Sequence, residues 1–294
     1  MYNLFFIMSI LVVINNKSGR QNAMSIYKKF LKNYFHKLNI MPMLFLINDR
    51  DETIFEDYFN RNIELIKNID LLILMGGDGT IHTILTKFLE EDIIVPTAIV
   101  PVGSGNGLFK SITYEEKKEY SLLESIKIIK QFISNKSNEE IDYNFSKHAM
   151  QANLIKVKDN NLQKDLNSLL AISWGFISDV DIKTECMRYM GSFRFDLGAI
   201  YYLIKKKVYK GTLKYKNDDN ENVTIKGDFF HFWACNSSWA SENTFSSPMS
   251  TLKDNYIYIS YIKAPINRCK LLSLLLKMNN GKFIYDKQVG YIKT

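Results

Sequence analysis

The residues best suited to chemistry in this chain are an aspartate and the glycines around it, at the end of an apolar run. Asp78 lies between Gly77 and Gly79, directly after the run Leu71–Met75. Glycine has no Cβ, so a phosphate can approach its backbone closely, and the bare amides can bind phosphate oxygens. Asp78 is then placed beside a phosphate that could be transferred. An ordinary turn capped by an aspartate is the alternative for this motif taken alone.

Two more loops of the same kind make phosphate binding the better interpretation. The apolar run Ile94–Val100 leads into the glycine-rich loop 101–107, and the first apolar run of the chain leads into the polar loop 15–20. Loops that follow parallel strands meet at the carboxyl edge of the sheet, where open α/β sheets bind ligands. The spacing fits neither the P-loop nor the dinucleotide-binding fingerprint.

Composition limits the class of protein. The chain has 294 residues, 46% of them hydrophobic, and a formal net charge of +7. Its lysines are spread along the sequence, which indicates a solvated surface or attraction to an anionic membrane, and no motif supports a nucleic-acid partner. Cys186, Cys235 and Cys269 have no metal-site or disulfide spacing, so we expect a reducing, cytoplasmic compartment. The sequence makes no prediction of oligomeric state.

The apolar start, Met1–Ile14, is too short to span a bilayer and lacks the features of a signal peptide. We interpret it as the first strand with a few extra residues, and Met8 is an alternative start. No other segment has the length and apolarity of a transmembrane helix.

Periodicity predicts the elements that position the loops. Apolar residues recur at helical spacing over 24–38 and 55–66, with a strand at Met43–Ile47 between them. This alternation predicts a doubly wound parallel sheet through Val100. A further helix is expected over Leu122–Ile133, and the polar stretch 134–140 is the best domain boundary. We therefore predict an α/β nucleotide-binding domain over 1–136 and a mostly antiparallel β-sandwich domain over 137–294.

The second half contains strands and turns rather than alternating helices. Residues 217–222 form the predicted turn of a hairpin, and helices are expected near 201–207 and 270–278. The expected strands are 153–157, 211–215, 223–226, 229–235 and 256–262.

A second candidate site lies in this half. Asp179 and Asp181 are two residues apart, so they point the same way on a strand or lie close together in a turn. Arg188 and Arg194 follow among aromatic residues, and a guanidinium can bind phosphate with two hydrogen bonds. A carboxylate beside an apolar wall suits a ligand with a positive or hydroxylated head and a greasy tail. An exposed acidic turn followed by an amphipathic helix explains the same residues without a ligand.

Taken together, the motifs resemble the diacylglycerol kinase catalytic-domain superfamily and, within it, the sphingosine kinases. The resemblance rests first on residues 76–79, 103–107 and 174–181 and continues through 189–198 and 209–215. It resumes at 239–242, 245–249 and 271–282, so that it covers nearly the whole chain. It implies an α/β nucleotide domain followed by an antiparallel β-sandwich that holds the lipid.

The resemblance also implies roles for individual residues. Asp78 would be the general base that accepts the proton of the substrate's primary hydroxyl, and Asp181, with Asp179 close to it, would bind the sphingoid head. The residues that would bind ATP are Asn15, Gly76, Gly77, Gly79, Thr80, Gly103, Ser104, Asn106, Arg188 and Arg194. The residues that would wall the lipid channel are Phe176, Ile177, Phe195 and Trp239.

The resemblance further implies ATP and Mg²⁺, with the ion held mainly by ATP oxygens, water and one or two carboxylates rather than by a dedicated set of protein ligands. Asp181 favours a sphingoid base as substrate, because sphingosine carries an ammonium whereas diacylglycerol and ceramide are uncharged there. The expected protein is a cytoplasmic lipid kinase with peripheral contact to an anionic membrane surface.

Some positions depart from the family pattern. Asn16 stands where the family has proline, Thr83 where it has glutamate, and Ile47 and Asn48 where it has a Thr-Glu pair. The chain also stops at Thr294, before an acidic turn that the family carries.

Three hypotheses follow: a sphingoid base kinase, a kinase for another substrate such as diacylglycerol or ceramide, and a non-catalytic lipid-binding descendant. NAD kinases and phosphofructokinases share the Gly-Gly-Asp-Gly turn but lack loop 103–107 and segment 174–181.

Overall fold

The structure, a computed structural model, describes residues 8–48, 53–138, 150–159, 165–191 and 193–294. Contacts divide the chain into two compact units. The first unit is Met1–Phe109 with Glu116–Met150, and the second unit is Lys110–Glu115 with Gln151–Thr294. The polar stretch expected at the domain boundary is helical as far as Asn138, and residues 139–149 lie outside the described part. The boundary at 136/137 stays a prediction.

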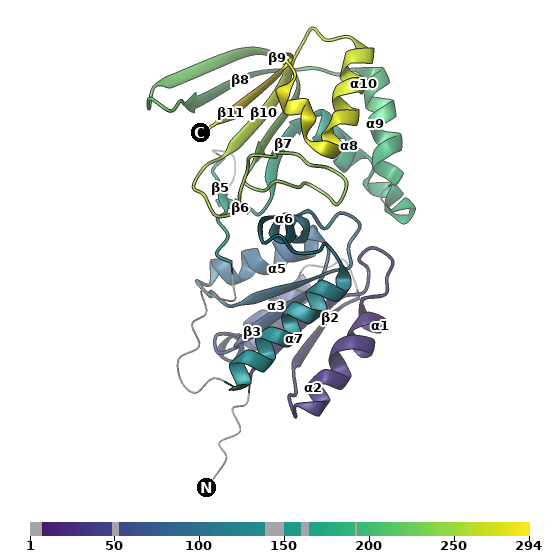
Figure 1. The fold of residues 1–294 in the computed structure, drawn as a ribbon, viewed down its shortest axis with the longest axis vertical. Coiled ribbons are helices and arrows are strands. Elements are labelled where there is room, and N and C mark those ends of the chain that lie inside the picture. Colours follow the sequence, from purple (N-terminus) through teal and green to yellow (C-terminus); the bar gives the residue numbers. More distant parts are fainter. Residues whose placement is uncertain (1–7, 49–52, 139–149, 160–164, 192) are drawn as a thin grey trace. The chain divides into compact units, whose positions relative to one another are not determined.

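The first unit alternates strands and helices (Figure 1). Its strands are β1 (Ile10–Asn15), β2 (Met43–Ile47), β3 (Leu71–Gly76) and β4 (Thr97–Pro101). Its helices are α1 (Ala23–Tyr27), α2 (Asn33–Lys37), α3 (Thr53–Arg61), α4 (Ile63–Ile66), α5 (Asp78–Glu90) and α7 (Leu122–Asn138), with a π-helical turn (Lys28–Lys32) joining α1 to α2. Helix α6 (Gly107–Glu115) is divided between the units after Phe109.

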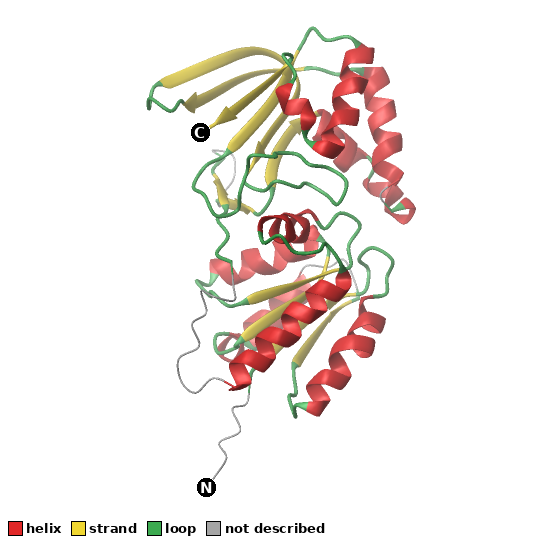
Figure 2. Cartoon of the chain, viewed as in Figure 1, coloured by secondary structure: helices red, strands yellow, loops and turns green. Residues whose placement is uncertain are grey.

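The four strands form a parallel sheet in the order β2-β1-β3-β4, as predicted. Strands β1 and β3 are buried on both faces, because helices cover both sides of the sheet (Figure 2). On one face, Val12 and Ile73 pack with residues of α1, α2 and α7. On the other, aromatic rings of α3 and α5 meet, with the Phe59 and Phe88 centroids 5.1 Å apart.

The strand order reverses between β1 and β3, since β2 lies on one side of β1 and β3 on the other. In open α/β sheets, ligands bind at the carboxyl ends of the strands beside such a switch point. The loops after β1, β3 and β4 are the three glycine-containing loops that the sequence singles out. One boundary differs from expectation: Ile94 is 93% exposed, and β4 begins at Thr97.

The second unit is built on an antiparallel sheet. Its order is β11-β10-β9-β7, with β8 paired to β9, and β5 and β6 form a separate pair. The strands are β5 (Ile155–Val157), β6 (Leu166–Ser168), β7 (Ala171–Gly175), β8 (Tyr209–Lys216), β9 (Asn222–Cys235), β10 (Tyr258–Lys263) and β11 (Val289–Lys293). The helices are α8 (Phe176–Lys183), α9 (Phe193–Lys205) and α10 (Arg268–Lys277), with 3₁₀ turns at Glu185–Met190, Met278–Asn280 and Lys282–Tyr285.

Helices α8, α9 and α10 gather on one side of this sheet (Figure 1). The side chains between them form an apolar cluster that includes Phe176, Phe230, Trp233, Ile262 and Leu271. We call this side of the sheet the helix-covered face. Fold class is thus mixed α/β, with a parallel sheet first and an antiparallel sheet second, as predicted.

Candidate functional site

The three glycine loops of the first unit meet at the carboxyl edge of its sheet. A Cβ built on Gly103 would lie 2.3 Å from Cα of Gly77, so the loops after β3 and β4 touch through their backbones. A Cβ built on Gly19, whose φ is +50°, would lie 2.2 Å from the carbonyl oxygen of Val102. Only glycine permits this approach. The packing therefore brings backbone amides of three loops together, as a phosphate site requires.

Two asparagines hold these loops in place. The Asn15 side chain donates to Thr80 Oγ1 at 2.7 Å, which ties the end of β1 to the first turn of α5. Asn106 is buried and left-handed (φ +51°), and its side chain accepts from Gly103 N and donates to Gly103 O, each at 2.9 Å. Both were predicted near the nucleotide, and here both have a positioning role. Ser104, in contrast, is exposed.

Asp78 is half-buried at the start of α5, and its carboxylate joins two elements of the first unit. Gly107 N donates to Oδ2 at 2.8 Å and Leu108 N donates to Oδ1 at 3.0 Å, so Asp78 caps the first turn of α6. Burial raises the pKa of Asp78, while these amide donors act to lower it. The amides fix the orientation of the carboxylate, and the neighbouring end of α5 provides an N-terminus suited to an anion.

The glycines give a testable contrast. Gly103→Ala is expected to separate the touching loops and lower thermal stability, because its Cβ has no room. A Cβ on Gly79 meets nothing within 4 Å, so Gly79→Ala should leave stability unchanged. If the open side of Gly79 faces bound phosphate, Gly79→Ala should nevertheless weaken ATP binding about tenfold. Melting curves and ATP titrations of both variants check this; full ATP affinity in Gly79→Ala would contradict phosphate contact there.

In the second unit, Asp181 pairs with a buried arginine. Arg194, whose side chain is 5% exposed, donates to Asp181 Oδ1 at 3.0 Å, and Asp181 itself keeps a side chain that is 63% exposed. The same guanidinium lies 3.4 Å from Glu185 Oε2 and donates to Thr184 Oγ1 at 3.2 Å. Arg194 was predicted to bind phosphate. In the structure its guanidinium instead donates hydrogen bonds to residues of its own unit. The Arg188 side chain lies outside the described part of the chain.

Asp179 and Asp181 do not share a direction, contrary to the strand or turn expected for this segment. The strand ends at Gly175, whose φ is +84°, and both carboxylates lie on helix α8. Residues two apart on a helix point about 200° apart. Asp179 therefore turns toward β8, where it accepts a hydrogen bond from the Tyr209 hydroxyl. Burial and this bond raise the pKa of Tyr209.

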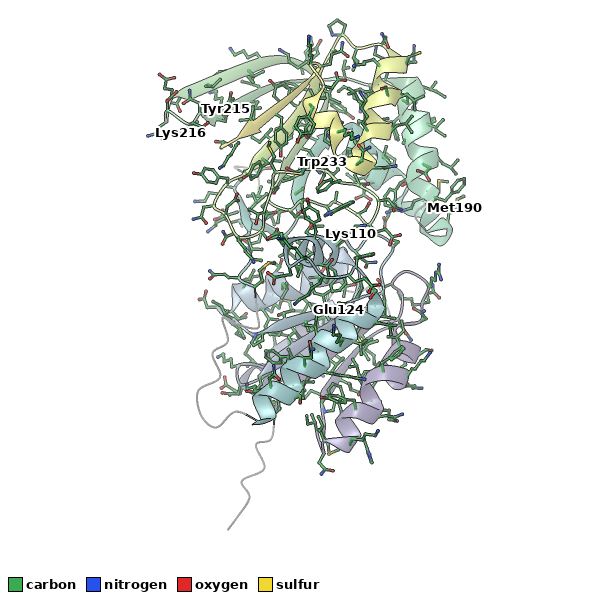
Figure 3. All side chains as sticks on the ribbon, viewed as in Figure 1. Lys110, Glu124, Met190, Tyr215, Lys216 and Trp233 are labelled. Carbon is green, nitrogen blue, oxygen red and sulfur yellow. The ribbon has the colours of Figure 1, made fainter. Side chains whose placement is uncertain are left out.

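Three of the four predicted lipid-wall residues come together. Phe176, Ile177 and Phe195 belong to the apolar cluster of the helix-covered face, where the Phe176 and Phe230 rings lie 4.9 Å apart. Trp239 lies elsewhere in the second unit: its ring stacks on Phe245 at 4.4 Å. Lys110, labelled in Figure 3, comes from helix α6, and its Nζ lies 4.2 Å from the centroid of the Trp239 ring.

Comparison with known proteins supports the predicted relationship. Residues 9–138 match the family model of the diacylglycerol kinase catalytic domain. Sphingosine kinase 1 of Arabidopsis thaliana is 25% identical over 331 residues, covering 97% of this chain and 62% of that protein. Sphingosine kinase 1 of Homo sapiens is 24% identical over 320 residues, covering 93% of this chain and 77% of that protein. The chain is thus similar to sphingosine kinases over most of its length.

A solved structure supports the fold independently. A diacylglycerol kinase from Bacillus anthracis str. Sterne superimposes with a TM-score of 0.58 at 15% identity, covering 98% of this chain and 82% of that one. The chain spans 62% of the length of sphingosine kinase 1 of Arabidopsis thaliana. Within the described residues, no helix is both long and apolar enough to cross a membrane, and no three His, Cys, Asp or Glu side chains group as a metal site.

Several residues of the candidate site were not predicted. The Tyr209 hydroxyl donates to Asp179, and Arg194 donates to Thr184 and Glu185. In the first unit, the Tyr120 hydroxyl lies 3.4 Å from Asn106 Nδ2. Each of these partners lies on another helix, strand or loop, at least nine residues away in the sequence, so no local pattern marks them. Gly19 had a local signal, since it follows the first strand within a polar loop. An apolar cavity of about 250 Å³ on the other face of the second sheet was also missed; it is lined by Trp174, Thr212, Leu213, Phe229 and Phe232.

Proposed function

We propose that this chain is an ATP-dependent lipid kinase that phosphorylates the primary hydroxyl of sphingosine or a related long-chain base. The observation that carries the proposal is the meeting of three glycine loops around Asp78, together with an exposed carboxylate at Asp181 beside an apolar cluster. The first arrangement suits phosphate groups, and the second suits a ligand with a cationic head and an apolar tail. The named activities of the relatives agree with both.

Asp78 is the proposed general base. Its carboxylate is oriented by Gly107 N and Leu108 N, and each oxygen retains a further lone pair for the substrate hydroxyl. Burial raises the pKa of Asp78, which favours proton acceptance, and the two amide donors partly oppose that rise. Backbone amides of Gly77, Gly79 and Gly103 are the proposed phosphate donors. Arg188 is also a proposed partner of the phosphates, whereas the guanidinium of Arg194 is already bonded to Asp181, Thr184 and Glu185.

The site is compatible with Mg²⁺ delivered as the ATP complex. The described residues contain no ready-made cluster of metal ligands, so ATP oxygens and water would hold the ion, with Asp78 as a candidate carboxylate near it. When bound, Mg²⁺ neutralises the charge that develops on the transferred phosphoryl group. The protein's own part is to position the phosphates and orient Asp78.

Asp181 is the proposed partner of the substrate ammonium. Asp179 is near in sequence but points away from Asp181 toward Tyr209 of β8. One Asp181 oxygen is already bonded to Arg194, while the exposed side of the carboxylate can accept from the lipid head. An uncharged head would leave this interaction unmade, which favours an amine-bearing lipid over diacylglycerol or ceramide.

Asp181→Asn is expected to raise KM for sphingosine about tenfold, equivalent to roughly 1.4 kcal/mol, with KM for ATP unchanged. The asparagine oxygen can still accept from Arg194, so the change removes the charge and keeps the packing. Glu185→Gln is the matched control, since Glu185 shares Arg194 at 3.4 Å but has no proposed contact with the lipid. Steady-state kinetics of both variants test the assignment; an unchanged sphingosine KM in Asp181→Asn would remove Asp181 from the lipid site.

We propose that the protein is cytoplasmic and contacts anionic membrane peripherally through α9. Four apolar or aromatic side chains of α9 are each at least 49% exposed, and their spacing places them on one side of the helix: Phe193, Ile200, Tyr201 and Ile204. Exposed Lys205 follows them, and the chain carries a net charge of +7. An apolar stripe beside lysines suits the interface of an anionic bilayer.

Replacing both Ile200 and Ile204 by glutamine is expected to reduce binding to phosphatidylserine-containing vesicles at least fivefold. Raising NaCl from 50 to 500 mM should weaken the wild-type interaction, because exposed charges are screened. Cosedimentation measures both effects. Ile94→Gln, at a position 93% exposed in the first unit, is the control. Equal losses in the control, or binding indifferent to salt, would contradict a specific α9 interface.

The activity itself is tested by transfer of labelled γ-phosphate from Mg-ATP to sphingosine, diacylglycerol and ceramide in parallel. Label in sphingosine alone would support the full proposal. Label in diacylglycerol or ceramide would support a lipid kinase but overturn the proposed role of Asp181 in selecting the substrate. A folded protein that binds ATP but labels none of the three would favour a non-catalytic lipid-binding descendant.

A further inference from the structure

Two buried polar side chains lie unpaired on the helix-covered face of the second sheet. His231 on β9 and Ser260 on β10 are each 1% exposed. Within the described part of the chain, no hydrogen-bond partner is present for Nδ1 or Nε2 of His231 or for Oγ of Ser260. Buried polar atoms of native proteins nearly always have a partner. Two unpaired residues on one face therefore indicate a group that the polypeptide does not supply.

The sheet register brings the two residues close together. Ile262 pairs with His231 and Ser260 pairs with Trp233 across the β9–β10 ladder, so His231 and Ser260 are diagonal neighbours on the same face. Diagonal neighbours have Cα atoms about 7–8 Å apart, a span that one small group between the side chains can bridge. The His231 ring meets the ring of Trp233 edge to face, with their centroids 5.5 Å apart.

This position lies within the proposed lipid-binding cluster. Trp233 and Ile262 belong to the same cluster as Phe176 and its partly buried neighbour Phe195. Phe176 begins α8 and its ring packs 4.9 Å from that of Phe230, the residue before His231. Asp181 lies five residues further along the same helix, about 7–8 Å by the helical rise. A polar group that reached His231 would thus belong near the head end of a lipid held by Asp181.

The chemistry of the two side chains selects the group. Burial lowers the pKa of His231 to about 3, so the ring is neutral and offers one donor and one acceptor. A hydroxyl also has one donor and accepting lone pairs, and so complements the imidazole and the Ser260 hydroxyl. An aliphatic chain alone leaves all three atoms unpaired, and a charged group would be buried without a counter-ion.

We propose that His231 and Ser260 hydrogen-bond a hydroxyl on the chain of the lipid substrate, which makes this site selective for hydroxylated long-chain bases. The proposal rests on the lipid-kinase function proposed above and deepens it by naming a substrate feature. A site built to bond a hydroxyl strongly disfavours an analogue that lacks it, because its own polar groups are then left unpaired.

The test compares sphinganine with 4-hydroxysphinganine, which differ by one hydroxyl. We expect wild-type kcat/KM to favour the hydroxylated base at least tenfold, and His231→Leu to reduce this preference to less than twofold with KM for ATP unchanged. Ser260→Ala, which removes one buried oxygen, keeps the test valid if His231→Leu fails to fold, and should lower the preference partially. Ser250→Ala is the matched control, because Ser250 Oγ is also buried and unpaired among the described residues but lies outside the strands.

A second readout separates this proposal from the kinase itself. Without ATP, 4-hydroxysphinganine should raise the melting temperature of wild-type protein more than sphinganine does, and this difference should vanish in the His231 and Ser260 variants. If neither base is phosphorylated, the proposed kinase function is rejected. The difference in melting temperature then still tests whether His231 and Ser260 bind the hydroxyl. A wild-type protein that does not distinguish the two bases, or variants that keep the wild-type preference, would overturn the proposal and leave a water-filled polar site.

Discussion

Asp78→Asn is expected to lower kcat by about 10²–10⁴-fold, the usual contribution of a positioned general base. It should also destabilise the fold, because both carboxylate oxygens accept backbone N–H groups of α6. An amide keeps one accepting oxygen and turns an NH₂ group toward the other donor, which costs about 1–3 kcal/mol for an unpaired buried group. The expected loss is about 2–4 °C in melting temperature for each kcal/mol.

Asp70→Asn is the control that separates chemistry from stability. Asp70 accepts from Ser9 N at 2.8 Å and from Lys136 Nζ at 2.5 Å, so it also joins distant parts of the first unit. It precedes β3, whereas the glycine loop follows that strand, so its loss should lower the melting temperature and leave kcat intact. Single-turnover kinetics and melting curves on both variants give the comparison. Substantial turnover in Asp78→Asn, at a temperature where it is folded, would reject Asp78 as the base.

His231 is expected to make the folded state sensitive to acid. Its pKa falls from an ordinary 6.5 to about 3 in the folded chain, because burial disfavours the charged ring. Between these values the unfolded chain binds the proton and the folded chain does not. Stability is therefore fully present above about pH 6.5 and falls as the pH drops toward 3, by several kcal/mol over the whole interval.

His231→Leu should flatten this part of the profile, so that its stability falls less between pH 6.5 and 4.5 than that of the wild type. Urea unfolding at a series of pH values measures the difference. His36→Gln is the control, since His36 is exposed on α2 and should leave the wild-type slope in place. Equal acid slopes for wild type and His231→Leu would mean that burial does not lower the pKa of His231 in the folded chain.

The fold was predictable where local pattern and tertiary burial agree. The runs that became β1 and β3 are apolar on both faces, which is typical of central parallel strands, and glycines mark where each loop begins. The start of β4 was placed too early because Ile94 is apolar but exposed, and the ladder begins only where Leu72 N bonds to Pro96 O. Apolar character alone does not show which residues have a neighbouring strand.

The site was predictable for its loops but not for its pairings. Gly77 and Gly103 could be assigned to one edge because parallel strands end together. In contrast, Arg194 belongs to α9 and Asp181 to α8, and their bond depends on how these helices pack. The change from strand to helix at Gly175 also has no cap signal in the sequence, since glycine lacks a capping side chain. When two residues meet only because separate helices pack together, their spacing in the sequence has no characteristic value, so the contact cannot be predicted from the sequence.

The contact of Asp78 with the first turn of α6 gives a spectroscopic consequence. Hydrogen bonds from Gly107 N and Leu108 N to a carboxylate shift the amide proton resonances according to the charge on that group. In an amide NMR titration, these two signals would follow the ionisation of Asp78 directly, without substrate and without turnover. Glycine amides resonate in an uncrowded region, so the Gly107 signal is the natural one to assign first. The protonation state of the proposed base could thus be observed through a neighbouring backbone rather than inferred from rates.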